Sequence, residues 1–269
     1  MSIQFIYKGG ALKDTTATSA RSMWQRDNQW DIVSPDREVS DTTNTNAKYV
    51  VINLQTHDCN QDNHKVATGH VVELAWKLFD DAGTTLETKQ YLLKPYGGYK
   101  QISESATSIH GITTACANKF GSDSYLVFDE LIKAIQQVPQ DGFVVAHDMD
   151  VKNTIMRNSL TPEQQEVWDA TPKCNTNDKA LLKYLPPDVK RKHYNFKYVK
   201  GSLSLPEMLR NIGQQPAGVY DVRIASRDTQ WTWDIFMYFK NHADCKKLKW
   251  NAIVIVPTQY PGIMRKVIG

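Results

Sequence analysis

Residues 49–56 read YVVINLQT, and this stretch begins the regular part of the chain. Its first half, YVVI, is a short apolar run rich in β-branched residues, which is typical of a buried strand. The run ends in Asn53 and Gln55, whose side chains have nearly the shapes of aspartate and glutamate but carry no charge. We therefore predict a buried strand that ends in two neutral amides.

Further strands are predicted on the C-terminal side of this segment. Residues 70–79 (HVVELAWKLF) alternate well enough for a second strand, and residues 88–94 (TKQYLLK) are predicted to form a third. Residues 143–146 are a fourth buried run, and residues 250–256 (WNAIVIV) indicate an added C-terminal strand.

Helical patterns separate and follow these strands. Residues 125–138 carry apolar side chains three and four positions apart, which predicts an amphipathic helix. More helices are expected near residues 153–160, from the cap residue Thr161 onward, over 178–185, from Ser204 to Gly213, and over 227–240. This order of elements predicts an α/β fold with a mixed central sheet flanked by helices.

Several segments, in order along the chain, resemble motifs of the DnaQ-like (DEDD) 3'→5' exonucleases. YVVINLQT resembles the family's strand ending in D-x-E-T, and ISESATSIHGIT (102–113) resembles its I-x-x-x-A-x-x-x-H-G-I-T segment near the substrate groove. FVVAHDMDVKNTIM (143–156) resembles L-V-A-H-N-x-x-F-D-x-x-x-L, and RIASRD (223–228) resembles H-x-x-x-x-D. The resemblance covers about residues 48–240 and implies an RNase H-like, DnaQ-like fold.

The same resemblance assigns five residues to a vestigial site. Asn53 and Gln55 stand at the positions of the first two carboxylates, Lys152 replaces a catalytic aspartate, and Arg223 replaces the general-base histidine. Asp228 keeps the last acid, so two cations against one carboxylate leave a formal charge of +1. Because the family uses four carboxylates to hold two Mg²⁺ ions, we expect no catalytic residue, no bound metal and no cofactor here.

The charge reversal also predicts a contact within the fold. Asp228 lies at helical spacing from Trp231, Thr232 and Ile235 and should therefore face the apolar side of its helix. A buried acid needs a partner, so we expect Lys152 or Arg223 to pair with it and to fill the vacated metal position.

Three neighbouring residues leave alternatives open. His147 is a remnant base, a metal ligand or a hydrogen-bonded structural histidine, and the last is favoured. Asp148 and Asp150 either rebuild a metal site or supply the cap of the following helix, which is favoured. The alternative function is an active metal-dependent 3'→5' exonuclease with a rearranged site. It would use one of these acids with Asp228, and His147 or Asp221 are further candidates for it.

A basic segment with interleaved aromatic residues follows the predicted exonuclease motifs. Such a segment can grip phosphates and stack bases, although it also suits a solvated loop. The candidate nucleic-acid-binding residues are Lys190, Arg191, Lys192, Tyr194, Phe196 and Lys197. Residues 246–250 (KKLKW) carry a weaker version of the same signal.

Composition divides the chain into three parts. Residues 1–47 are predicted to be an N-terminal arm. It has a short apolar start at residues 3–7, and the stretch after Gly10 is rich in Thr, Ser, Asp and Asn, which predicts loop or partial disorder. Residues 48–240 form the exonuclease-like domain and residues 241–269 a C-terminal extension. Trp24 and Trp30 are large aromatics within the arm, which indicates that the arm docks onto the domain or a partner.

Charge and cysteine content narrow the class of protein. The net charge is +3, so any affinity for nucleic acid must come from a local patch. The four cysteines are far apart, which argues against a zinc site or a disulfide framework. No apolar run approaches the roughly 18 residues of a membrane span, and no secretory signal is visible.

These observations predict an intracellular protein of the cytoplasm or nucleus, with a mitochondrial location left open. We expect a catalytically inactive exonuclease-like protein, acting as a scaffold or adaptor or as a nucleic-acid-binding subunit of a larger assembly. Its expected partners are proteins of that complex and single-stranded RNA or DNA, and no membrane.

Overall fold

The computed structural model describes the backbone of residues 4–7, 30–33, 46–58, 69–178, 181, 185, 203–214, 223–241, 254–256 and 265–266. Side chains are described for the same residues except those of 4–7, 30–33, 254–256 and 265–266.

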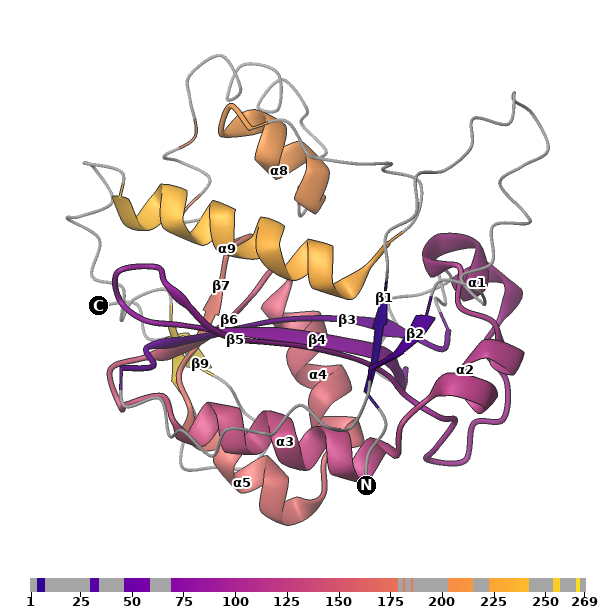
Figure 1. Ribbon diagram of the computed structural model, residues 1–269. Helices are drawn as coiled ribbons and strands as arrows, with labels where there is room; N and C mark the ends of the chain where they lie inside the picture. Colours follow the sequence, from indigo (N-terminus) through magenta and orange to yellow (C-terminus); the bar gives the residue numbers. More distant parts are fainter. Residues whose placement is uncertain are drawn as a thin grey trace.

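The centre of the molecule is a seven-stranded sheet with the strand order β5-β4-β3-β6-β7-β8-β9 (Figure 1). Its strands are β3 (Tyr49–Thr56), β4 (Val71–Phe79), β5 (Thr85–Leu92), β6 (Phe143–Ala146), β7 (Lys173–Asn175), β8 (Val254–Val256) and β9 (Arg265–Lys266). β3 pairs antiparallel with β4 and parallel with β6, and β6 pairs parallel with β7. The outer strands β5, β8 and β9 are all antiparallel to their neighbours, so the sheet is mixed, as predicted.

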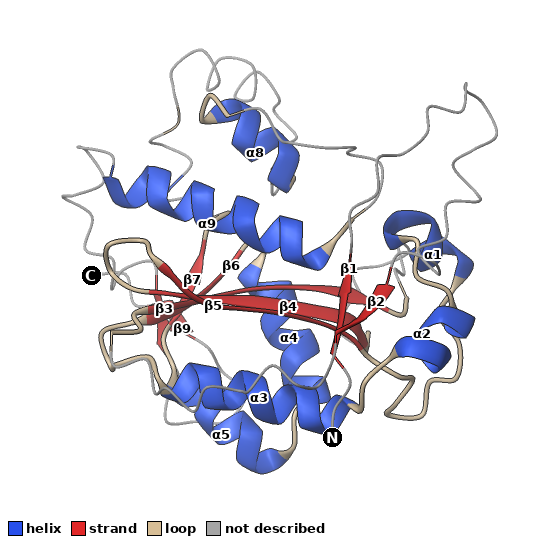
Figure 2. Cartoon of the chain, in the orientation of Figure 1, coloured by secondary structure: helices blue, strands red, loops and turns tan. Residues whose placement is uncertain are grey.

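Helices cover both faces of the sheet (Figure 2). α8 (Leu205–Asn211) and α9 (Ala225–Asn241) lie on one face, and α3 (Ser124–Gln136), α4 (Met149–Ser159) and α5 (Pro162–Ala170) lie on the other. The short helices α1 (Glu104–His110) and α2 (Thr114–Phe120) lie at one end of the sheet. This layered arrangement buries a sheet face against each set of helices.

Alternation along β3 assigns its side chains to these two layers. Val50, Ile52 and Leu54 belong to the hydrophobic cluster beneath α3, α4 and α5. Tyr49 and Val51 belong to the cluster beneath α8 and α9. Because successive side chains of a strand point to opposite faces, the next residues on the α9 face are the two amides predicted as site residues.

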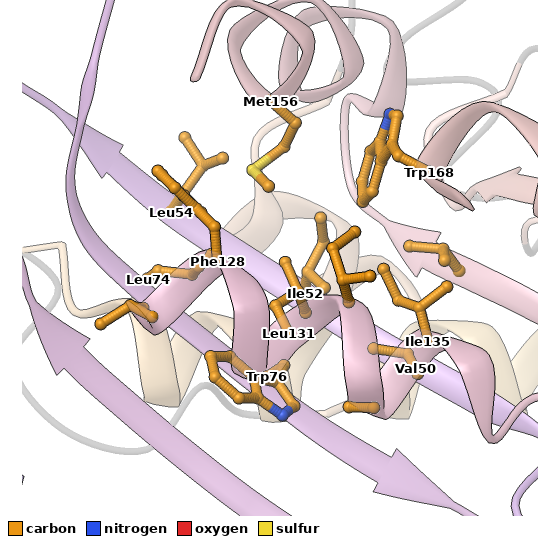
Figure 3. Close-up of a cluster of buried hydrophobic side chains, with 14 of the residues drawn as sticks. Val50, Ile52, Leu54, Leu74, Trp76, Phe128, Leu131, Ile135, Met156 and Trp168 are labelled. Atoms are coloured by element: carbon orange, nitrogen blue, oxygen red, sulfur yellow. The ribbon is translucent and has the colours of Figure 1, made fainter. Parts of the chain in front are cut away.

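The larger core lies between β3, β4 and the helices α3, α4 and α5. Figure 3 shows Ile52 and Leu54 of β3 packed among side chains of these helices. The large apolar side chains Trp76, Phe128 and Trp168 are almost fully buried here. Burying a side chain of this size contributes roughly 1.5–3 kcal/mol to folding, so this core is the rigid base on which the α9 layer rests.

Helix starts follow the capping chemistry expected from the sequence. Thr161 and Gln164 form a reciprocal capping box at the start of α5, with Pro162 in its first turn. Ser204 and Glu207 form a second capping box at α8. These contacts satisfy backbone N–H groups that would otherwise have no partner in the first turn of each helix.

Several predicted boundaries and one element differ from the structure. β5 begins three residues before the predicted residue 88, and α4 begins at Met149 rather than near residue 153. β7 was not predicted, because three residues that include Lys173 carry no strand pattern. The expected helix at 178–185 lies largely outside the described residues, and β8 covers only the end of the predicted 250–256 strand.

The N-terminal arm contains secondary structure that its composition did not predict. β1 (Gln4–Tyr7) and β2 (Trp30–Val33) form a two-stranded antiparallel sheet, so the interpretation of the stretch after Gly10 as loop is wrong for β2. β1 lies beside β5, the edge strand of the main sheet. None of the described helices is long and apolar enough to cross a lipid bilayer.

Candidate functional site between β3 and α9

The carboxyl end of β3 carries two buried amides. Asn53 is 3% exposed, and its Oδ1 accepts the backbone N–H of Leu54 at 2.8 Å. Its Nδ2 is buried and has no hydrogen-bond partner among the described residues. Gln55 is also buried and stands opposite Glu73 in the antiparallel register with β4. The strand is therefore buried and ends in two amides, as predicted, and these amides lie on the α9 face of the sheet.

Glu73 is a buried carboxylate that the sequence interpretation missed. Its side chain is fully buried, with Oε1 accepting from Gln90 Nε2 at 2.7 Å and Oε2 accepting the backbone N–H of Ala225 at 3.1 Å. Ala225 is the first residue of α9. The signal was present in the sequence, because Glu73 is an acid inside an otherwise apolar strand run.

Asp228 lies in the first turn of α9 and is 2% exposed. Arg223 Nη1 lies 3.7 Å from Asp228 Oδ2, which confirms the predicted pairing of these two residues. Arg227 Nη2 donates to Asp228 Oδ1 at 3.4 Å, a second ion pair that was not predicted. The Arg227 guanidinium also lies 4.3 Å from the ring centroid of Trp231. One acid is therefore shared between two arginines.

Lys152 approaches the same acid without forming an ion pair within 4 Å. Its Nζ donates to the backbone carbonyl of His147 at 2.5 Å. Burial lowers the pKa of Lys152, the acids Asp148 and Asp228 raise it, and Arg223 lowers it further. The three ionic groups predicted from the sequence thus meet in one place, with Lys152 held by the end of β6 rather than by Asp228.

The charges around Asp228 have opposing effects on its titration. Burial raises its pKa, while Arg223, Arg227 and Lys152 each lower it. The rise reflects the cost of desolvating a carboxylate, and the three cations offset part of that cost. Asp228 is therefore a buried acid that depends on its cationic neighbours.

α1 links the end of β3 to the start of α9. The backbone N–H of Arg223 donates to the carbonyl of Ile109 at 2.9 Å. At the other end of the link, His110 Nε2 lies 3.1 Å from the carbonyl oxygen of Thr56. The 102–113 segment therefore positions Arg223 relative to Gln55, which gives a physical role to the segment that resembles the family motif.

His147 is held in place through both ring nitrogens. Nδ1 lies 2.9 Å from Thr176 Oγ1 and Nε2 lies 2.6 Å from the carbonyl oxygen of Leu203. Burial lowers its pKa to about 4, so the ring is neutral near pH 7. This geometry supports the structural interpretation of His147 over a base or metal ligand.

One of the two neighbouring acids, Asp148, is the N-cap residue of α4. Asp148 stands at the N-cap position of α4 with φ 55°, yet its side chain makes no capping hydrogen bond. Instead its Oδ1 accepts from Asn177 Nδ2 at 2.7 Å. Asp150 is exposed in the first turn of α4. The prediction that one of them caps the following helix is therefore confirmed for the position of Asp148, but its side chain binds Asn177 and not the first turn of α4.

Comparison with solved structures identifies this arrangement of elements. E. coli Exonuclease I in complex with a dA16 oligonucleotide aligns with a TM-score of 0.51 and 14% identity, covering 74% of this chain and 41% of that chain. A structure of exonuclease I bearing on how processivity is achieved aligns with a TM-score of 0.53 and 16% identity, covering 74% and 42%. The chain has an RNase H-like α/β fold of the exonuclease type.

The likeness is one of fold. This chain spans about two fifths of the length of those exonuclease chains. No family model and no curated protein matches the sequence. On this fold, the carboxyl ends of the parallel strands β3 and β6 bring together the amides, Lys152 and the ion pairs of Asp228.

The residues present do not fit a pair of magnesium ions. A two-metal site requires several oxygen ligands with negative charge to balance the dications. Among the described residues, no group of three or more His, Cys, Asp and Glu side chains is placed to hold a metal ion. Lys152 and Arg223 add positive charge beside the one acid at the centre of the site.

The predicted basic segment stays a prediction. Lys190, Arg191, Lys192, Tyr194, Phe196 and Lys197 lie outside the described residues, as do residues 246–250 and Asp221. The positive groups that the structure does place together are Lys152, Arg223 and Arg227.

Proposed function

We propose that this protein is a catalytically inactive, exonuclease-like binding protein that works as a scaffold, an adaptor or a nucleic-acid-binding subunit of a larger assembly. One observation carries the proposal. Asp228, the acid that the family resemblance identifies as the last metal ligand, is paired with Arg223 and Arg227. A guanidinium in this position competes with a metal ion for the same carboxylate oxygens.

Electrostatics argues in the same direction. Two unit charges about 4 Å apart interact by about 4 kcal/mol at an effective dielectric constant of about 20, and a divalent ion doubles that figure. Lys152, Arg223 and Arg227 all act on Asp228, so a dication beside Asp228 would meet three positive charges. Asn53 and Gln55 supply no charge to compensate for them.

The same charges favour a polyanionic partner. Exchanging carboxylates for amides and cations removes the repulsion of a phosphate backbone and adds groups that attract it. E. coli Exonuclease I, which shares the fold, has been crystallised with single-stranded oligonucleotides. Single-stranded RNA or DNA beside β3 and α9 is therefore the nucleic-acid form of the proposal, and a protein partner is its scaffold form.

The deciding experiment separates cutting from binding. Purified protein is mixed with labelled single-stranded RNA and DNA in Mg²⁺ and in Mn²⁺, beside the variant Asp228→Ala. Asp129→Ala, on the opposite face of the sheet, is the matched control. We expect no shortening of either strand, and a salt-dependent gel shift if the nucleic-acid form is correct. Shortening that Asp228→Ala abolishes and Asp129→Ala retains would show an active exonuclease with a rearranged site and overturn the proposal.

A protein without cleavage and without a gel shift would point to the scaffold form. The purified protein is then added back to an extract of its source cells and crosslinked, and mass spectrometry identifies its neighbours in the assembly. The nucleic-acid form predicts that a strand competes with the crosslinks at β3 and α9, whereas the scaffold form predicts that it does not.

A further inference from the structure

The buried amide of Asn53 has a donor group without an acceptor. Its Oδ1 accepts the N–H of Leu54 at 2.8 Å, which fixes the orientation of the amide, because the reversed orientation would set two donors against each other. Nδ2 is therefore a true donor, and it has no partner among the described residues although the side chain is 3% exposed. Leaving such a group unsatisfied costs about 1–3 kcal/mol.

Asn53 presents this donor to the layer beneath α9. It lies on the same face of β3 as Val51, which packs with Phe236 of α9. Asn53 also stands opposite Ala75 in the register with β4, and the carbonyl of Ala75 accepts from Thr229 Oγ1 at 3.5 Å. Thr229 follows Asp228 directly, so the donor faces the part of the layer where the ion pairs lie.

The arginines near Asp228 lie farther from it than in a short ion pair. Arg223 Nη1 is 3.7 Å from Asp228, which is longer than a hydrogen bond, and Arg227 Nη2 is 3.4 Å away. Two other ion pairs of the molecule are shorter, at 2.7 Å for Lys240 with Asp81 and 2.8 Å for Lys133 with Asp129. Charge-assisted hydrogen bonds are typically about 2.7–2.9 Å long, so Asp228 does not satisfy the Arg223 guanidinium.

Lys152 has donors to spare as well. An ammonium group has three N–H donors, and the carbonyl of His147 accepts one of them. No second acceptor for Lys152 exists among the described residues, although its charge interacts with Asp148 and Asp228. An amide, an ammonium and a guanidinium thus lie at the carboxyl ends of β3 and β6, and each has donors that the described residues around it do not use.

We propose that the site at the carboxyl ends of β3 and β6 binds one phosphate group, through Asn53 Nδ2, Lys152 Nζ and the Arg223 guanidinium. The inference rests on the proposed loss of catalysis, because a working exonuclease would need the same space for metal ions. Phosphate offers several acceptor oxygens around one centre, which suits donors arriving from a strand, a helix start and a second helix. Arg223 is one-third exposed, so the group can enter from solvent.

Asp228 makes the proposal distinctive. It is the acid that contacts these cations, and its negative charge opposes a bound anion. Replacing it with Asn removes the repulsion and leaves the donors in place, so Asp228→Asn should strengthen phosphate binding. A metal-dependent site predicts the opposite, since there the same change removes a ligand. Asp148 and Glu73 are the other nearby acids, and Asn177, Gln90 and Ala225 already donate to them.

The test is a calorimetric titration of the full chain with inorganic phosphate at constant ionic strength. Binding should weaken by roughly tenfold or more in Lys152→Met and in Arg223→Gln, because each loses a charged donor. Arg223→Lys keeps the charge and should retain part of the affinity. Lys133→Met, an exposed cation on α3 across the sheet, should bind as the wild type does. Urea unfolding of each variant shows whether it is folded.

Two further titrations distinguish a free phosphate ion from the phosphate at the end of a nucleic-acid strand. Single-stranded oligonucleotides with a 3'-phosphate and with a 3'-hydroxyl are titrated in the same way. Stronger binding of the 3'-phosphate form supports a strand end, and equal binding of the two forms with retained binding of inorganic phosphate supports a small free anion.

The proposal is overturned if inorganic phosphate does not bind the wild type, if Lys152→Met and Arg223→Gln bind it as Lys133→Met does, or if Asp228→Asn weakens binding. If any of these three results is obtained and no strand is cleaved, only the proposed phosphate site is wrong. Cleavage in Mg²⁺ or Mn²⁺ that depends on Asp228 removes the proposed function itself, so the two failures are distinguishable.

Discussion

Glu73 Oε2 accepts the backbone N–H of Ala225 at 3.1 Å, and this bond ties the second strand of the sheet to the first residue of α9. The first N–H groups of a helix have no partner within the helix, and its N-terminus carries partial positive charge. A carboxylate placed there satisfies both needs. Because α9 carries Asp228 and begins two residues after Arg223, this contact sets the position of the whole candidate site.

Replacing Glu73 with Ala should therefore destabilise the protein strongly. The buried backbone N–H of Ala225 loses its acceptor, at a cost of about 1–3 kcal/mol. The half-buried side chain of Gln90 loses its acceptor too, at a smaller cost because water can reach it. The free energy of unfolding, measured in urea, should fall by several times the change seen for Glu166→Ala, an exposed acid on α5. Equal urea midpoints for the two variants would show that Glu73 does not hold α9.

The fold was predictable because its signals are local. The run at 49–56, the three-four spacing at 125–138 and the Thr161 cap each lie within a few residues of one another, and all appear as predicted in β3, α3 and α5. β7 was missed because its buried lysine is stabilised from elsewhere. Lys173 donates to the carbonyls of Trp168 and Thr171 and lies over the Trp168 ring, which no strand pattern can indicate.

The candidate site was predictable only in part. Asn53, Lys152 and Asp228 were found by their places in motifs, and the pairing of Asp228 with Arg223 followed from the need of a buried acid for a partner. The acid Glu73 inside an apolar strand run signals a buried carboxylate, but its partner Ala225 lies 152 positions away and cannot be read from the residues near either of them. The second arginine, Arg227, was missed because its role depends on the direction of its side chain over Trp231.

The ion pairs of Asp228 predict a graded response to removing its cations. Arg223→Gln leaves a buried carboxylate with less compensation and should lower the free energy of unfolding by about 1–2 kcal/mol, less than a fully buried pair would because Arg223 is one-third exposed. Lys152→Met should cost less, since burial already lowers the pKa of Lys152 and disfavours its charge. Urea unfolding beside Lys133→Met measures both.

The size of these losses in stability shows whether the cations compensate the buried charge of Asp228 or do not stabilise the fold. If Arg223→Gln and Lys152→Met unfold at the same urea concentration as Lys133→Met, the cations do not compensate Asp228 and the predicted stabilising role is wrong. A loss in Arg223→Gln that disappears in the double variant with Asp228→Asn would assign the effect to this pair.

His147 predicts a loss of stability in acid. Burial lowers its folded pKa to about 4, against 6.5 for an ordinary histidine, so the unfolded chain takes up the proton first as the pH falls. The contribution of His147 is complete above pH 6.5, falls between pH 6.5 and 4, and amounts to roughly 3 kcal/mol. Urea unfolding at a series of pH values between neutral and acid measures this decline.

The variant His147→Asn isolates the histidine from the other groups. It should be less stable at neutral pH, because the contacts with Thr176 and Leu203 change, yet its stability should depend less on pH. Asp228 has the opposite effect on stability, since its raised pKa favours the folded state in acid. Asp228 is present in both the wild type and His147→Asn, so its effect cancels when their pH profiles are compared. Parallel pH profiles for the variant and the wild type would contradict the role assigned to His147.

Two adjacent glycines provide a matched steric test. Gly97 has φ +63°, and a Cβ at this position would lie 2.5 Å from Cε1 of His70. Gly98 has φ +88°, and a Cβ there would meet nothing within 4 Å. Gly98→Ala should cost only the backbone penalty of about 1–2 kcal/mol for a left-handed residue, and Gly97→Ala should cost clearly more because the His70 ring must move. Urea unfolding of the two variants measures the difference in stability. Equal losses of stability would show that the His70 ring moves aside at no measurable cost.

Restoring the family's charges should create a metal site where the wild type has none. The variant with Asn53→Asp, Gln55→Glu, Lys152→Asp and Arg223→His brings three carboxylates and an imidazole to Asp228, the ligand types that two Mg²⁺ or Mn²⁺ ions require. Calorimetric titration with Mn²⁺ should show binding to this variant and no binding to the wild type at the same concentration. Asn53→Asp with Gln55→Glu alone is the control, and it should bind weakly, because Lys152 and Arg223 still repel the ion. Binding of two Mn²⁺ ions by the wild type would refute the electrostatic argument, since the cations around Asp228 would then fail to exclude dications.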